Sequence, residues 1–216
     1  MRNKKIPKIK YIYNLAKKLP FFGFDDLIGM ETDRIYLKIL FSRYEKSGRV
    51  VRLKKGLYVA KEYLDNLEKK GRLSAYLELV SNILYEPCYL SLDYILYKHN
   101  LLTEVPVNFT LVSTRKTKSF ANVLGRFFYH KIKKGLFRGF TAARKESDFM
   151  ILEATKAKAL FDFLYFRKNL LSNKESAEEL RLNLVGFTAK DKTELMSYVK
   201  MEKSKKMKTI INYLFT

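Results

Sequence analysis

The sequence contains one cysteine, Cys88, and two histidines, His99 and His130, among its 216 residues. A single cysteine cannot form an intramolecular disulfide, and the cysteine and histidine spacings of zinc fingers are absent. Neither histidine stands beside an acidic cluster, and the sequence has no phosphate-binding glycine loop and no nucleophile motif. We therefore predict that the protein is not an enzyme and that it needs no metal or cofactor.

Long hydrophobic runs are also absent. No apolar stretch approaches the roughly 20 residues that a membrane-spanning helix needs. The basic N-terminus is not followed by an uninterrupted apolar stretch, so we expect no secretory signal and predict a cytoplasmic location. Cys88 is expected to be a small buried residue.

Acidic residues are scarce relative to basic ones, and the formal net charge is +21. Residues 1–71 carry 18 Lys and Arg against 8 Asp and Glu, and residues 98–145 carry 11 against 1. Such a charge attracts polyanions and releases counterions on binding, which favours a nucleic acid or an anionic partner surface. A lysine-rich proteome would give the same composition, so charge alone supports nucleic-acid binding only modestly.

The most informative stretch runs from Phe24 to Ala60. A short helix is expected over 25–28, ended by Gly29, and Thr32 or Asp33 can cap a second helix that runs to about Lys46. Two β-prone runs, 49–53 and 57–60, then flank a Lys-Lys-Gly turn and predict a hairpin. A recognition helix followed by a basic wing is the arrangement with which small domains reach a DNA groove and its flanking phosphates.

The residues predicted to contact DNA belong to this helix, its N-terminus and the hairpin. They are Thr32, Arg34, Lys38, Ser42, Arg43, Arg49, Arg52, Lys54 and Lys55. On the helix, Arg34, Lys38 and Ser42 stand at i, i+4 and i+8 and form a polar stripe. This stripe is the candidate for base contacts in the major groove. The hairpin cations suit phosphate contacts. The alternative is that the stripe is only the solvated side of an amphipathic helix.

Several positions around this motif have open alternatives. Tyr36, Leu37, Leu40 and Tyr44 share one face of the helix and are predicted to pack on the preceding helices. Ile35 and Ile39 could pack against the wing or, if exposed, contact thymine methyls. Arg49 either contacts the DNA backbone or covers apolar surface. The N-terminal cations could follow a groove or belong to a solvated tail; they are Arg2, Lys4, Lys5, Lys8 and Lys10.

Apolar spacing gives the coarse organisation of the rest of the chain. Helices are predicted over 10–19, 73–85, 92–98, 155–168, 174–182, 188–199 and 204–214, with Ser91 as the cap of the third. Strands are predicted over 107–112, 123–132, 139–143 and 149–152, and 113–118 is expected to be a basic loop. The predicted fold class is α+β, with a winged helix-turn-helix domain (1–61), a connector (62–72), and an α+β domain (73–216) with a small, mostly antiparallel sheet and C-terminal helices.

Five segments resemble the AbiEi-type antitoxins in order along the chain. They are RIYLKILFSR (34–43), GRVVRLKKGLY (48–58), YLSLDYILYKHNLLTEVP (89–106), TRKTK (114–118) and EATKAKALFD (153–162). Asn100 stands where the family usually has glycine, and Lys156 and Ala157 replace its usual Pro-Glu. The resemblance implies a repressor of its own operon that binds operator repeats. It also implies an antitoxin, in a phage-defence system, against a cognate nucleotidyltransferase toxin of the AbiEii type.

The second basic block lies outside the predicted DNA-binding motif. Its main residues are Arg115, Lys116, Lys118, Arg126, Lys131, Lys133, Lys134 and Arg138. We rank an auxiliary DNA contact slightly ahead of docking to the toxin, and a solvated sheet face is the third interpretation. Residues 73–216 are expected to neutralise the toxin without the N-terminal domain.

A nucleic-acid-processing enzyme and a general RNA-binding protein remain the rival classes. Lys158 and Asp162 are predicted to form an ion pair on a helix surface.

Overall fold

The computed structural model describes residues 8–27, 33–144 and 149–215. The chain divides into two compact units, one formed by Met1–Leu77 with Asn122–Leu124 and the other by Glu78–Ala121 with Gly125–Thr216. The fold class is α+β, as predicted from the sequence. Within the described ranges, no helix is both long enough and apolar enough to cross a membrane.

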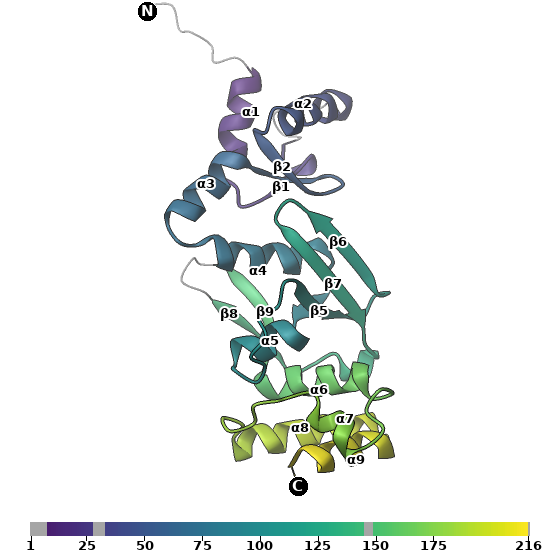
Figure 1. Cartoon of the computed structure of the whole chain (residues 1–216). Helices are drawn as coiled ribbons and strands as arrows, with labels where there is room; N and C mark the ends of the chain where they lie inside the picture. The colour runs from purple at the N-terminus through teal and green to yellow at the C-terminus, as the bar shows by residue number, and fades with distance from the viewer. Residues whose placement is uncertain (1–7, 28–32, 145–148, 216) are drawn as a thin grey trace, which may run out of the picture. The chain divides into compact units, whose positions relative to one another are not determined.

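The N-terminal unit combines helices with a small antiparallel sheet (Figure 1). Its elements are α1 (Lys8–Ala16), β1 (Phe22–Gly23), the 3-10 helix η1 (Asp25–Leu27), α2 (Arg34–Lys46), β2 (Val50–Lys54), β3 (Leu57–Ala60) and α3 (Lys61–Lys69). The strand order is β1-β3-β2, with β3 antiparallel to both neighbours. The predicted helix–hairpin order is present, and β1 is a third strand that the sequence did not indicate.

The core of this unit is rich in aromatic side chains. Phe22 from β1 and Phe41 from α2 are fully buried, and Tyr58 from β3 is 7% exposed. The ring centroids of Phe41 and Tyr58 are 5.6 Å apart, and those of Phe22 and Phe41 are 5.1 Å apart. These contacts fix one face of α2 against the sheet and leave the opposite face outside the core.

The segment predicted as a connector is a regular helix. Helix α3 begins directly after β3 and covers most of 62–72, with Leu64 and Leu67 buried. Helix α4 (Leu73–Leu84) follows, and the boundary between the two units falls within it, between Leu77 and Glu78.

A six-stranded sheet forms the centre of the second unit. Its strands are β4 (Cys88–Leu90), β5 (Phe109–Ser113), β6 (Lys118–Asn122), β7 (Gly125–Lys131), β8 (Phe140–Arg144) and β9 (Met150–Ala154), in the order β6-β7-β5-β4-β9-β8. The sheet is mixed, because β4 with β9 and β5 with β7 are parallel pairs, whereas β4 with β5 and β8 with β9 are antiparallel. The sheet that was predicted as small and mostly antiparallel is thus a larger, mixed sheet. The edge strand β6 was not predicted, and it begins at Lys118, the last residue of the segment expected as a basic loop.

Helices complete the second unit, and Figure 1 shows α6 next to the strands, with α7, α8 and α9 gathered on its other side. They are α5 (Leu92–Lys98), the 3-10 helix η2 (Lys134–Leu136), α6 (Lys156–Arg167), α7 (Lys174–Glu178), α8 (Ala189–Glu202) and α9 (Lys205–Phe215). Each longer helix corresponds to a predicted one. Ser91 precedes α5 as expected, but its hydroxyl does not cap the helix and instead donates a hydrogen bond to Asp162. Cys88 is buried, as predicted.

Candidate nucleic-acid interface

Local sequence cues define both ends of α2. The carboxylate of Asp33 accepts hydrogen bonds from the backbone amides of Ile35 and Tyr36 at 2.8 and 3.2 Å, which satisfies two free first-turn donors. At the other end, Gly48 has a φ of 70°, a conformation that glycine adopts at little cost. The helix therefore leads directly into β2.

The inward face of α2 is apolar. Leu37 and Phe41 are fully buried, and Leu40 and Tyr44 are at most 7% exposed. Tyr36, predicted on this face, is half-buried and packs at the edge of the core. Phe41 was not predicted as a core residue, although its i, i+4 relation to Leu37 places it on the same face.

The outward face of α2 carries polar and cationic side chains. Lys38 and Ser42 are exposed, as the predicted stripe requires, and so is the neighbouring Arg43. Arg34 is also exposed, but its guanidinium forms an ion pair with Asp25 of η1. Lys46 was not among the predicted contacts, although it continues the i, i+4 series from Ser42 and is exposed.

The β2–β3 hairpin follows α2 directly. Gly56 has a φ of 79° in the turn, as the sequence predicted, and the register shifts between Arg52 and Lys54. Arg52 and Lys55 are exposed, and Lys54 is half-buried. We call the set Lys38, Ser42, Arg43, Lys46, Arg52, Lys54 and Lys55 the α2–hairpin surface.

Two of the predicted DNA contacts, Arg49 and Thr32, do not belong to this surface. The guanidinium of Arg49 lies 5.5 Å from the ring centroid of Tyr44, which is the covering role that its alternative interpretation described. Thr32 lies outside the described residues, as do Arg2, Lys4 and Lys5 of the basic N-terminal tail.

The eight residues of the second basic block are all exposed, and they come from several parts of the second unit. Arg115 and Lys118 cover aromatic rings: the Arg115 guanidinium lies 4.5 Å from the Tyr85 centroid, and the Lys118 ammonium lies 4.7 Å from the Phe120 centroid. Lys118 belongs to β6, Arg126 and Lys131 belong to β7, and Lys134 belongs to η2. The connecting segments hold Arg115, Lys116, Lys133 and Arg138. The block thus places two cations over the neighbouring rings of Tyr85 and Phe120, whereas Arg138 lies beside Met201 of α8.

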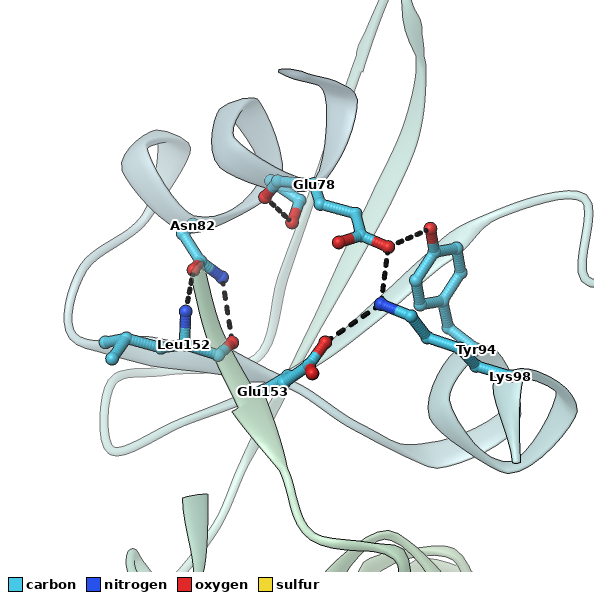
Figure 2. A network of polar contacts seen from close by, with 7 residues as sticks. Glu78, Asn82, Tyr94, Lys98, Leu152 and Glu153 are labelled. Carbon is cyan, nitrogen blue, oxygen red and sulfur yellow. Dashed lines mark hydrogen bonds and ion pairs between the residues drawn. The ribbon is translucent and has the colours of Figure 1, made fainter. Parts of the chain in front are cut away.

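A polar network joins α4, α5 and β9 (Figure 2). The Lys98 ammonium lies 2.7 Å from Glu78 Oε1 and 2.9 Å from Glu153 Oε2, and the Tyr94 hydroxyl donates to Glu78 Oε1 at 2.9 Å. We call these four residues the Lys98 network. Since one ammonium bonds to both carboxylates and ties two helices to the sheet, the geometry supports a structural role for these residues.

The pair Lys158–Asp162 is not on a helix surface, and that prediction was wrong. Both side chains are fully buried, with Lys158 Nζ 2.6 Å from Asp162 Oδ1. Asp162 Oδ2 accepts hydrogen bonds from Tyr89 Oη at 2.9 Å and from Ser91 Oγ at 2.8 Å. Burial raises the pKa of Asp162 and lowers the pKa of Lys158, while each opposes the shift of the other. Tyr89 on β4 and Ser91 just after it lie 73 and 71 residues away from Asp162 in sequence, which is why the i, i+4 spacing alone could not reveal the burial.

Among the described residues, no group of three or more His, Cys, Asp or Glu side chains is placed to hold a metal ion. The chain matches no known family model and no curated protein. The candidate site therefore depends on the α2–hairpin surface and its chemistry.

Proposed function

We propose that the N-terminal unit is a winged helix-turn-helix domain that binds operator DNA. The observation that carries this proposal is the α2–hairpin surface. One helix has its apolar face buried in the core and its cationic face exposed, and it leads directly into a hairpin that presents Arg52 and Lys55. A helix suits the major groove, and cations on an adjoining hairpin suit the phosphates beside it.

We further propose that the protein is an AbiEi-type antitoxin that represses its own operon and counteracts a nucleotidyltransferase toxin. The resemblance of the five sequence segments supports this assignment, and so does the strongly positive charge that operator binding needs. The exposed cations of the second basic block suit an auxiliary track for DNA phosphates or a docking face for the toxin.

The hairpin lysines give a quantitative test of DNA binding. Binding of the full chain to the DNA upstream of its own gene is measured over a salt series, for the wild type and for Lys54→Ala/Lys55→Ala. The slope of log K against log salt is negative, and each lost phosphate contact makes it shallower by about 0.9, so the slope of the double variant is expected to be shallower by about 1.8. The matched control is Lys69→Ala/Lys70→Ala, which removes the same charge from the exposed end of α3 and its cap.

Equal slopes for the two double variants would contradict a specific role of the hairpin. Structured RNA is measured beside the duplex, and tighter binding to RNA would instead favour the RNA-binding class. Nucleotide turnover with Mg²⁺ present would favour the enzyme class.

The antitoxin role is tested separately, by co-expressing the full chain with a nucleotidyltransferase toxin of the AbiEii type, which the proposal expects to be encoded beside it, and scoring growth. We expect growth to be restored by the wild type and equally by Lys54→Ala/Lys55→Ala, because neutralisation is assigned to the second unit. Continued toxicity with both proteins abundant would overturn the antitoxin role and leave the DNA-binding proposal intact.

A further inference from the structure

Two isoleucines occupy the exposed face of α2. Ile35 is 68% exposed and Ile39 is 48% exposed, whereas the other large apolar residues of this helix lie in the core or at its edge. Residues four apart lie one turn from each other on the same face, so these two side chains form a short apolar strip. Neither is buried against the hairpin, which was one of the two options that the sequence left open.

The surroundings of this strip are cationic. Helix α2 has four exposed basic side chains, Arg34, Lys38, Arg43 and Lys46, and one acidic side chain, Glu45. The solvent-facing side of an ordinary helix is mainly polar, and a single exposed apolar residue on it needs no explanation. Here two adjacent isoleucines lie within a basic face, a combination that fits a polyanion with apolar groups exposed in a groove.

We propose that Ile35 and Ile39 recognise thymine by contacting its C5-methyl group in the major groove of duplex DNA. This inference rests on the proposed DNA-binding function and names the bases that the helix recognises. The thymine methyl is the apolar group that the major groove presents, and it distinguishes T·A from A·T and from both G·C orientations. Ile35 is the second residue of α2, and the N-terminal part of a recognition helix is the part that contacts base edges.

A protein–protein contact explains the strip less well. A stable interface buries about 800 Å² on each partner, and two isoleucine side chains supply only a small part of that area. Lys38, Arg43 and Lys46 around the strip would also repel the same face of a second copy.

The test uses thymine and deoxyuridine, which form the same base-pair hydrogen bonds and differ by the C5-methyl. The full chain first selects duplexes from a library with a random core, and each thymine of the selected duplex is then replaced singly by deoxyuridine. We expect one or two positions at which the replacement weakens binding about fourfold, the effect of losing one buried methyl contact. No enrichment in the selection would overturn the DNA-binding function itself. Enrichment without any deoxyuridine effect would overturn only the thymine inference.

The variant Ile35→Ala/Ile39→Ala tests whether these two side chains make the contact with the methyl group. Alanine has a higher helix propensity than isoleucine and both sites are exposed, so the helix is retained, and its far-UV circular dichroism verifies this. The deoxyuridine effect is expected to disappear in this variant and to persist in the control Val185→Ala, which truncates an aliphatic side chain that is 96% exposed in the second unit. An unchanged deoxyuridine effect in the isoleucine variant would overturn the inference. A second result would also overturn it: the isoleucine variant has a sedimentation mass different from that of the wild type, and the wild type shows no deoxyuridine effect. This combination would assign the strip to self-association.

Discussion

Replacing Lys158 with methionine removes one charge from a fully buried ion pair. Both partners are 0% exposed, and Asp162 keeps only the hydrogen bonds from Tyr89 and Ser91 when the ammonium is lost. Removing one partner of such a pair leaves an uncompensated buried charge, at a cost of about 3–5 kcal/mol in the free energy of unfolding. Because the total stability of a domain is about 5–15 kcal/mol, this single change should destabilise the second unit severely.

The assay is urea unfolding followed by far-UV circular dichroism, together with native-state amide exchange of α6, which reports on this unit directly. The exposed pair Lys61–Asp65 gives a matched control, because it has the same i, i+4 spacing and a distance of 2.8 Å. Lys61→Met should cost about 0.3 kcal/mol. The double variant Lys158→Met/Asp162→Asn should cost clearly less than the sum of the single changes, since neither charge is then left alone. A Lys158→Met cost no larger than that of the control would refute the reasoning.

Three further predictions concern the second unit. Gly139→Ala should destabilise by at least about 1 kcal/mol, because Gly139 has a φ of 77° and an added Cβ would collide with the Tyr198 hydroxyl, whereas Gly135→Ala has open space and should be nearly neutral by thermal unfolding. Lys98→Met leaves the two carboxylates of the Lys98 network without their shared cation and should lower the urea midpoint; an unchanged midpoint would contradict the assigned role. Burial, and secondarily a nearby arginine, lowers the pKa of His130 from 6.5, so the unfolded chain takes up the proton first and stability should fall as the pH drops below about 6.5. His130→Gln should flatten that fall, and an identical pH slope in both proteins would show that the histidine does not contribute.

Features determined by neighbouring residues were predictable from the sequence. Helix α2 has its cap at Asp33 and its end at Gly48, and the hairpin has Gly56 in its turn, so each boundary depends on a few adjacent residues. The exposure of Lys38 and Ser42 likewise follows from helical periodicity. The function assigned to these residues remains a prediction that the DNA measurements test.

Features determined by distant residues were not predictable in the same way. Strand β1 consists of two residues and exists because Phe22 pairs with Tyr58, 36 positions later. The parallel pair of β4 with β9 joins Leu90 to Glu153, 63 positions later, and the parallel pair of β5 with β7 forms across the intervening strand β6. No local pattern distinguishes either pair from antiparallel neighbours. Ser91 has a good capping sequence context, yet its hydroxyl donates to a buried carboxylate on α6, and its oxygen accepts no first-turn amide of α5.

The central claim is sequence-specific binding of duplex DNA, and the most direct measurement is a ratio of two affinities. Fluorescence anisotropy compares the full chain on the DNA upstream of its own gene with a scrambled duplex of the same length and composition, at physiological salt. The account predicts a preference of at least about 10³-fold for the upstream DNA, the lower end for specific DNA-binding proteins. Equal affinity for both duplexes would contradict the account and leave only charge-driven binding by a protein of net charge +21.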